Sequence, residues 1–457
     1  MRIATTNMTL GLLVIGNLVV GHALLGCGSE SSDPPVTPSP QAGTTGNAGG
    51  GTGGAAGATG GTSGGGEAGA GGAAAGAGGE AGAAGAGGSC GLRAIRDPES
   101  GMCRCQPMTL TMCSDGCHDP MKDPDHCGQC ENACGATSAC EMGACTPAPT
   151  EVLSAAAATG CGSTSLAVSG GTLYWASSMA GTIQSLPAGG APTMVATGQM
   201  GPKSLQVHGD SLFWMNEGTN EVMSVPLAGG TPAAIVTTAM ITDTTNGLGG
   251  YTVSADAMTL YFADGVTIYS MPVAGGAATE VGHEDSGIPK ALAVEGDLIA
   301  FPADINGDVD VMTIMDGTPA VCASDDSTTA VNLNCARIAR SQGALNLDNI
   351  FLVDGNAYWG NQSSFQTSSA AMPTGFNDVV ANGSPDSSKL TSFTVFSGMS
   401  YFGDDEGNVF SAPLMVNATP KKLGRGQMGI TSFAADATTV YWANEDCSIQ
   451  SMPASTP

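Results

Sequence analysis

The stretch TSFAADATTVYWANEDCSIQSMP at residues 431–453 contains the pattern that decides the fold. A short apolar segment is followed by a turn, by the aromatic pair Tyr441-Trp442, by a polar turn, and by a segment that ends at Pro453. The stretch TSLAVSGGTLYWASSMAGTIQSLP at residues 164–187 has the same order. Apolar segments that alternate with polar turns, without any run of helical period, predict short β-strands.

The aromatic pair, or a relic of it, recurs through the C-terminal two thirds of the chain. Its positions are Tyr174-Trp175, Phe213-Trp214, Tyr261-Phe262, Ala300-Phe301, Tyr358-Trp359, Tyr401-Phe402 and Tyr441-Trp442. The spacings of 39, 48, 39, 58, 43 and 40 residues each fit one four-stranded blade of a β-propeller. We therefore predict an all-β chain with a seven-bladed propeller over residues 147–457, with six or eight blades as alternatives. A β-sandwich of repeated hairpins is the competing fold.

The last unit has no fourth strand of its own before residue 457. Residues 149–153 (PTEVL) align with the fourth-strand segments at 192–195 and 278–281. We predict that this early strand completes the last blade, which closes the ring without an open sheet edge.

Four cysteines of the propeller region form two predicted disulfides. Cys161 follows the closing strand, and Cys447 lies in the turn between the second and third strands of the last blade. These two loops lie on the same face of a propeller, so we predict a Cys161–Cys447 bond. Cys322 and Cys335 are then expected to pair within a loop inserted after blade four.

A Cys-rich module is predicted over residues 89–146, where almost no aliphatic side chain is available for a core. It contains ten cysteines: Cys90, Cys103, Cys105, Cys113, Cys117, Cys127, Cys130, Cys134, Cys140 and Cys145. An even number in so short a segment predicts five disulfides, whose pairing the spacing does not decide. A zinc site built from Cys127, Cys130, His118 and His126 is the alternative, which an oxidising compartment disfavours.

The N-terminus has the features of a secretory signal. Arg2 is the only charged residue among the first 29, and an interrupted apolar run follows at residues 8–20. The end of this segment, Leu24-Leu25-Gly26-Cys27, resembles the lipobox of bacterial lipoproteins. This resemblance implies a signal peptide at 1–26, lipidation of Cys27 and anchoring in a membrane by acyl chains. By analogy with that family, Gly28 after the cysteine indicates the outer membrane or cell surface as the location. The alternative is an ordinary signal peptide in which the cysteine is incidental.

Residues 27–88 are predicted to be a disordered tether. Residues 43–88 are nearly all Gly and Ala, with some Thr and Ser and without a collagen period. Such a segment buries too little apolar surface to offset the entropy of ordering it. A flexible coil of about 60 residues spans roughly 40 Å on average, so the tether separates the folded part from the anchor.

Two further resemblances concern the folded region. The cysteine pattern from Cys113 to Cys145 resembles a short Cys-rich repeat of bacterial surface proteins, which implies exposure outside the cytoplasm. The segments Tyr441-Trp442-Ala443-Asn444 and Tyr174-Trp175-Ala176-Ser177 resemble the Tyr-Trp-Thr-Asp type of propeller. The Thr-Asp half is replaced here, and that family typically has six units. The overall layout is also similar to lipoprotein propellers of uncharacterised function.

The charge balance limits the class of partner. Forty Asp and Glu stand against 13 Lys and Arg, a net charge of −27. A chain this acidic is not expected to bind nucleic acid or to dock on anionic lipid through a basic patch. Residues 151–457 alone hold eight Lys and Arg and 28 Asp and Glu, a net charge of −20.

The polar turns between the second and third predicted strands carry many of these acids. They share one face of a propeller, so we expect an acidic face that favours a cation or a basic partner. The competing explanation is that these acids only keep the surface soluble. The residues of this predicted acidic face are Glu217, Asp264, Asp404, Asp405, Glu406, Glu445 and Asp446.

Asp304, Asn306, Asp308 and Asp310 form a candidate calcium site, because oxygen ligands recur there at alternate positions. The stretch departs from the calcium-loop pattern, because Gly307 stands at the fourth position and Met315 where a glutamate should close the shell. Asn306-Gly307 is also a strong signal for a plain hairpin turn, which is the favoured interpretation.

The sequence contains no nucleophile elbow, His-Glu-x-x-His motif or phosphate loop. His208 and His283 are expected at strand ends on opposite faces of the propeller, so no catalytic residue is predicted. The first functional hypothesis is a cell-envelope lipoprotein whose propeller binds a protein or glycan without catalysis. The alternatives are a propeller enzyme, such as a polysaccharide lyase or hydrolase, and a structural component of an envelope assembly.

Overall fold

The computed structural model describes residues 93–97, 100, 102–154, 162, 164–243, 245–284, 287–303, 308–314, 318–322, 334–339, 345–361, 364–369, 378–382 and 389–455. The predicted signal peptide, Cys27 and the predicted tether lie outside these residues. Within them, no helix combines the length and the hydropathy of a membrane span.

The described strands form seven blades of a β-propeller, which confirms the predicted fold class and blade number. Blades 1 to 3 contain β8 (Thr164–Ser169), β9 (Thr172–Ser177), β10 (Thr182–Pro187), β11 (Thr193–Ala196), β12 (Pro202–His208), β13 (Ser211–Asn216), β14 (Glu221–Pro226), β15 (Ala233–Val236), β16 (Leu248–Val253), β17 (Thr259–Asp264), β18 (Thr267–Pro272) and β19 (Thr279–Glu284). A 3-10 helix, η2 (Thr238–Met240), connects blades 2 and 3.

The remaining blades follow the same antiparallel order of strands. Blades 4 to 7 contain β20 (Ala293–Glu295), β21 (Leu298–Ala303), β22 (Asp308–Thr313), β24 (Cys335–Ala339), β25 (Leu345–Val353), β26 (Asn356–Asn361), β27 (Ser364–Ser369), β28 (Asp378–Asn382), β29 (Leu390–Phe396), β30 (Met399–Asp404), β31 (Val409–Pro413), β32 (Lys421–Gly424), β33 (Ile430–Ala435), β34 (Thr439–Asn444) and β35 (Ile449–Pro453).

The second member of each aromatic pair joins its blade to the preceding one. Trp214 of blade 2 packs in one cluster with Tyr174 of blade 1, and Trp442 of blade 7 packs with Met399 and Tyr401 of blade 6. All seven of these side chains are almost completely buried: Trp175, Trp214, Phe262, Phe301, Trp359, Phe402 and Trp442. Truncating a core aromatic to alanine costs about 3–5 kcal/mol, so these contacts account for much of the adhesion between blades.

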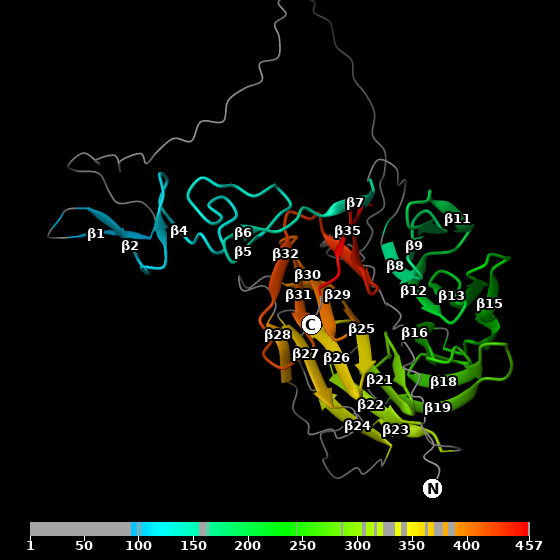
Figure 1. The fold of residues 1–457 in the computed structure, drawn as a ribbon. Helices are drawn as coiled ribbons and strands as arrows, with labels where there is room; N and C mark the ends of the chain where they lie inside the picture. Colours follow the sequence, from blue (N-terminus) through cyan, green and yellow to red (C-terminus); the bar gives the residue numbers. More distant parts are fainter. Residues whose placement is uncertain are drawn as a thin grey trace, which may run out of the picture. The chain divides into compact units, whose positions relative to one another are not determined.

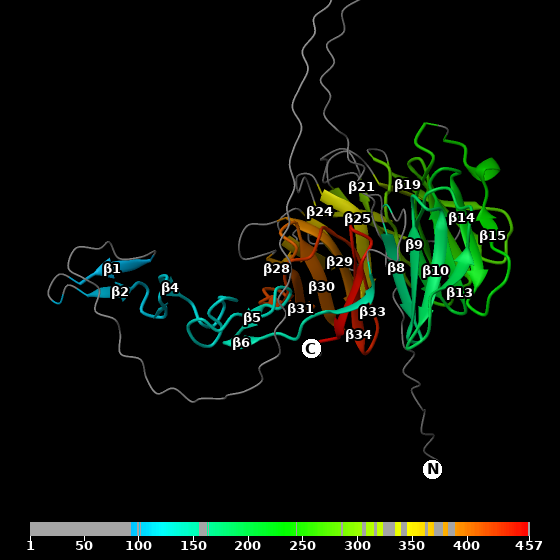
Figure 2. The ribbon, with the colours of Figure 1, turned by 90° about the horizontal axis from the view of Figure 1, so that it is seen from above.

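The ring closes as predicted. β7 (Thr150–Leu153) pairs antiparallel with β35 as the outer strand of blade 7, with Leu153 opposite Ile449 (Figure 1). On the inner side, β33 of the last blade lies beside β8 of the first (Figure 2). The described part of the last blade therefore combines strands from both ends of the propeller.

The spacing of 58 residues between the fourth and fifth aromatic positions indicates an insertion. Its place in the fold differs from the prediction. It falls inside blade 4, between β22 and β24, whereas the sequence placed it after that blade. Its strand β23 (Ala320–Cys322) pairs in parallel with β19, so it extends blade 3. The pairing partner of β23 lies far back in the sequence, and no aromatic landmark in the insertion could indicate it.

The Cys-rich module consists of short two-stranded sheets and disulfides. Its strands are β1 (Ala94–Arg96), β2 (Cys103–Cys105), β3 (Thr111–Met112), β4 (Cys117–His118), β5 (Cys140–Glu141) and β6 (Ala144–Cys145). Among the described residues, disulfides join Cys105 to Cys117, Cys113 to Cys130, Cys127 to Cys140, and Cys134 to Cys145. Each of these loops overlaps the next along the chain, so the disulfides link the module into one continuous structure.

Candidate functional site

One face of the propeller carries the turns between second and third strands together with the loops that connect successive blades; we call it the loop face. In blade 2 the turn after β13 contacts the incoming loop, because the Gly218 N–H donates to the Met200 carbonyl over 2.9 Å. In blade 7 the Glu445 N–H donates to the carbonyls of Met428 and Gly429. Turn and loop are therefore joined by backbone hydrogen bonds in both blades.

A glutamine holds each of these two loops, and we call the arrangement the glutamine clamp. The Trp214 indole N–H and the Asn216 amide donate to Gln199 Oε1, over 3.0 and 2.9 Å. The Trp442 indole and the Asn444 amide donate in the same way to Gln427 Oε1, over 2.9 and 3.3 Å. The buried indoles thus find the hydrogen-bond acceptor that a buried tryptophan needs.

The residue after each clamped glutamine points into solvent. Met200 is 57% exposed and Met428 is 66% exposed. Both belong to the sequence Gln-Met-Gly, at 199–201 and 427–429, whose glycines have positive φ angles of 67° and 64°. The clamp therefore presents a flexible, polarisable apolar side chain on a fixed loop, which suits binding to varied surfaces.

The predicted acidic face lies on the loop face and divides into two groups. Five of its residues are exposed: Glu217, Asp405, Glu406, Glu445 and Asp446. Glu217 accepts a hydrogen bond from Lys203 Nζ over 2.6 Å, and Asp446 accepts from the Ser448 N–H and hydroxyl. These exposed acids leave the loop face open to a cationic group.

The other two predicted acids are buried and organise turns. Asp264 accepts from the N–H and hydroxyl of Thr242 and from the N–H of Asp243. Asp404 accepts from the N–H of Glu406 and from the N–H and side-chain amide of Asn408. Their carboxylates stabilise the loop backbone through several N–H donors, a role that the sequence pattern alone did not separate from ligand binding.

Half of the predicted calcium set lies around an arginine. Asp304 and Asn306 fall outside the described residues, while Ala303 pairs with Asp308 across the β21–β22 hairpin. Arg337 of β24 reaches Asp308 Oδ2 over 3.0 Å and Asp310 Oδ1 over 3.1 Å. Asp308 and Asp310 thus contact a guanidinium, which supplies the positive charge that a calcium ion would supply.

The same arginine contacts a carboxylate of the preceding blade. Its Nη2 lies 3.7 Å from Oε1 of the fully buried Glu284. Burial and the nearby Glu284 charge raise the pKa of Asp310 to about 8, against the opposite effect of Arg337. Beside this cluster, Cys322 of β23 is bonded to Cys335 of β24, the pair expected from the sequence. Blades 3 and 4 are thus joined by both charge and a covalent bond.

The two histidines of the propeller lie where the sequence placed them, but one differs in environment. His208 ends β12 and is buried, with its Nε2 3.1 Å from Gln206 Oε1 and its ring edge-on to Phe213. Burial lowers the pKa of His208 to about 4, so it is neutral at pH 7. His283 lies in β19 beside Glu280 and is partly exposed.

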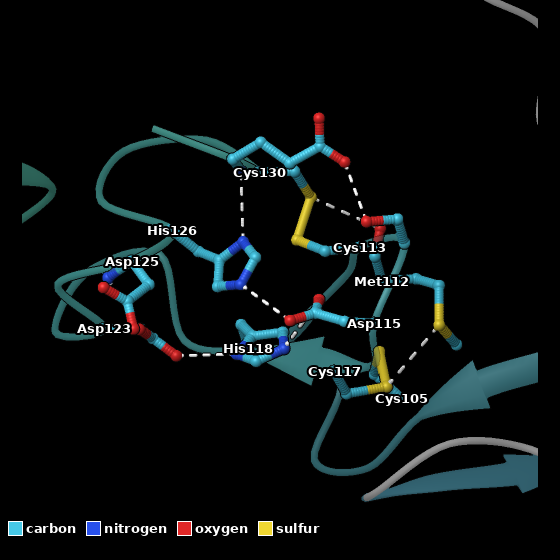
Figure 3. A network of polar contacts seen from close by, with 12 residues as sticks. Cys105, Met112, Cys113, Asp115, Cys117, His118, Asp123, Asp125, His126 and Cys130 are labelled. Carbon is cyan, nitrogen blue, oxygen red and sulfur yellow. Dashed lines mark hydrogen bonds and ion pairs between the residues drawn. A yellow bond between two sulfur atoms is a disulfide. The ribbon is translucent and has the colours of Figure 1, made fainter. Parts of the chain in front are cut away.

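The Cys-rich module gathers a second polar cluster that we call the His–Asp cluster (Figure 3). His118 Nε2 lies 3.1 Å from Asp115 Oδ1, and His126 Nε2 lies 3.3 Å from Oδ2 of the same carboxylate. His118 Nδ1 donates to Asp123 over 2.6 Å, and the Glu131 N–H donates to His126 Nδ1 over 3.0 Å. One exposed carboxylate therefore bridges two imidazoles.

Charge complementarity sets the protonation of this cluster. The hydrogen bond to Asp123 raises the pKa of His118, and the charge of Asp115 adds to the shift. Burial is the largest single effect on Asp123 and raises its pKa, but the hydrogen bonds from His118 and from the Asp125 N–H, together with the attraction of the two histidines, leave the pKa below its ordinary value. The two rings lie with their centroids 3.8 Å apart. The Glu131 N–H donates to Nδ1 of His126, so this ring directs its other nitrogen, Nε2, at Asp115.

The remaining predicted cysteines are placed as follows. Cys127 and Cys130, which the zinc alternative required as thiols, belong to two different disulfides. Cys103 and Cys447 are also in disulfides. Cys161 and Cys90 lie outside the described residues, so the Cys161–Cys447 pair stays a prediction.

Comparison with known proteins adds support for the fold. No protein-family model matches the chain, and no curated protein matches it in sequence. A solved streptogramin B lyase is similar, with a TM-score of 0.53 and 14% identity over 67% of this chain and 97% of that one. A catalytically inactive virginiamycin B lyase from Staphylococcus aureus with quinupristin has a TM-score of 0.52 and 12% identity, over 67% of this chain and 99% of that one. At these identities the likeness is one of fold.

Sequence reasoning missed the glutamine clamp, and it grouped His118 and His126 with Cys127 and Cys130 as a zinc alternative rather than with Asp115 and Asp123. A signal for the clamp was present, since Gln-Met-Gly occurs at both 199–201 and 427–429, each time 15 residues before a tryptophan. The approach of the two carboxylates to these histidines had no comparable signal, because the disulfide pairing that folds the module cannot be derived from cysteine spacing.

Proposed function

We propose that this chain is a lipid-anchored protein of the cell envelope whose propeller binds a protein or glycan without catalysis. The observation that carries the proposal is the loop face: Met200 and Met428 are held in solvent by the same clamp, among exposed carboxylates. Functional residues are often found on loops that a rigid scaffold positions. Anchoring rests on the lipobox-like segment that ends at Cys27.

The charge of the loop face favours a partner with cationic groups. The exposed Glu445 and Asp446 follow β34, next to the loop that presents Met428. A polypeptide that offers both apolar and basic side chains can contact the thioethers and the carboxylates together.

Binding is tested with the full-length chain against glycan arrays and against envelope proteins. Charge reversal at Glu445 and Asp446 to lysine should weaken binding by at least tenfold. The matched control is Asp210→Lys, because Asp210 is an exposed acid in the turn before β13, at the opposite end of the strand from the loop face. Equal loss in both variants would contradict the loop face as the binding surface.

A propeller enzyme is the second candidate, since the streptogramin B and virginiamycin B lyases share the fold. Incubation of the chain with envelope polymers, followed by mass spectrometry of the products, tests it. If the chain turns over a polymer and one substitution on the loop face abolishes that turnover, the proposal of a non-catalytic binding protein is replaced by that of an enzyme. The anchor is tested separately, because Cys27→Ser should release the protein from the membrane fraction without changing its binding.

A further inference from the structure

We propose that Asp115, His118 and His126 of the Cys-rich module bind a divalent transition-metal ion of the zinc class. The ligand atoms of the three side chains lie within 4.8 Å of one another. Both imidazoles direct Nε2 at the carboxylate of Asp115, as Figure 3 shows. A cation placed among these atoms takes the position of the protons that the rings now share with Asp115. The proposal is independent of the proposed function of the propeller.

The donor set selects the metal. Two imidazole nitrogens and one carboxylate oxygen suit zinc and neighbouring transition metals, whereas calcium and magnesium prefer all-oxygen ligands. Three protein ligands leave a coordination position open for water or for another molecule. A metal ion can reach the cluster from solvent at Asp115, whose side chain is 59% exposed. The His126 side chain, which is 7% exposed, forms the buried side of the site.

A supporting carboxylate is already in position. His118 donates Nδ1–H to Asp123 over 2.6 Å, which leaves Nε2 as the ligating atom once its proton has left. Metal-bound histidines commonly donate their other N–H to a carboxylate in this way, and losing that partner typically reduces metal affinity by about 10–100-fold. Binding releases the Nε2 proton of His118 to solvent. On His126 the proton moves from Nε2 to Nδ1, and the hydrogen bond from the Glu131 amide is given up.

The cysteines near this site do not compete with it for the metal, because they are bonded in disulfides. Two other clusters in the described residues contain enough sulfur and nitrogen atoms to suggest metal ligands: Cys113, His126 and Cys130, and Cys127, Cys134 and Cys145. Their sulfurs are bonded in disulfides and are not thiolates, the form that binds metal. The site therefore depends on imidazole and carboxylate, and it exists in the oxidised protein.

The test is calorimetric titration of the full-length oxidised chain, stripped with EDTA, with Zn²⁺, together with visible spectroscopy of the Co²⁺ form. We expect one equivalent to bind, at least a hundredfold loss of affinity in His118→Ala, and a 10–100-fold loss in Asp123→Asn. Ca²⁺ should not compete. The matched control is His283→Ala, because His283 belongs to β19 of the propeller, pairs with Glu280 over 3.3 Å and is not one of the three proposed ligands.

Peptide mapping without reduction checks that each variant keeps its disulfides, and His118→Gln provides a second substitution if the alanine variant misfolds. Absence of stoichiometric Zn²⁺ binding would overturn the proposal. Affinity that is unchanged in both His118 variants would overturn it too. Binding that develops only after reduction would assign the metal to cysteine thiolates and equally exclude this site.

Discussion

The propeller and the Cys-rich module both have a buried interior, but the side chains that form it differ in chemistry. Trp442 lies against Met399 and Tyr401 of the neighbouring blade, in a cluster made of large apolar side chains. The buried cluster of the module consists of Cys127, Cys134 and Cys140. Repetition supplies the propeller with apolar area at every blade, whereas the short module depends on covalent links and on its His–Asp cluster.

Reduction should give the largest difference between the two regions. Each disulfide that closes a loop of about 15 residues contributes about 3 kcal/mol, so loss of the module's bonds should unfold it completely. The propeller should stay folded, because its blades depend on buried aromatic contacts. Hydrogen exchange with and without a phosphine reductant measures both regions in one sample. Protected module amides in the reduced protein would contradict the comparison.

Truncation of an aromatic side chain between two blades should destabilise the propeller and leave the Cys-rich module unaffected. Trp442→Ala removes a fully buried side chain and should destabilise the propeller by about 3–5 kcal/mol. Exchange in the module should not change. Denaturant unfolding gives the magnitude, with Met428→Ala as the control, since this exposed neighbour should cost less than about 0.5 kcal/mol.

Acid should weaken the propeller through His208. Its pKa is about 4 in the folded chain and about 6.5 when unfolded, so above pH 6.5 both states are neutral. As the pH falls from 6.5 towards 4, only the unfolded state takes up the proton, and about 3 kcal/mol of stability is lost. Denaturant unfolding across this pH range should show the slope, and His208→Gln should flatten it. His283→Gln should leave the slope intact; equal flattening by both would assign it to another group.

The two glutamine clamps should contribute equally. Gln427→Ala and Gln199→Ala each leave a buried indole N–H without its acceptor, at a cost of about 1–3 kcal/mol. Because the surroundings repeat, the two losses should agree within about 0.5 kcal/mol. Thermal unfolding of both variants measures the two losses of stability. Losses that differ by much more than this would mean that the two clamps share their geometry but not their contribution to stability.

Calcium should have the smallest effect. Arg337 already holds Asp308 and Asp310, so added Ca²⁺ should leave the melting temperature unchanged relative to EDTA. A calcium-dependent rise that Asp308→Asn removes would restore the predicted calcium site instead.

The sequence predicted the parts of the fold that repeat. The aromatic pairs located each blade because one ring of every pair must be buried against the preceding blade, and residues 149–153 were recognised by their likeness to other fourth strands. The insertion in blade 4 was misplaced, since β23 pairs in parallel with a strand from another blade. Local pattern carries no signal for such a contact.

Prediction of the candidate sites was weaker for a physical reason. Spacing placed Asp404 and Asp446 on one face, but it could not tell that Asp404 is buried by its own turn while Asp446 remains exposed. The approach of His118 to Asp115 depends on which cysteines pair, and several pairings are compatible with the same spacing. Burial and disulfide connectivity therefore had to come from the structure.

The most direct test of the loop face as the binding surface is site-specific photocrosslinking in intact cells. A photoreactive residue at Met200 reports on the loop face, and one at Asp210 reports on the opposite end of β13. We predict one discrete crosslinked product from position 200, lost on charge reversal at Glu445 and Asp446, and none from position 210. Products of equal yield from both positions, or a product only from position 210, would contradict a binding role for the loop face.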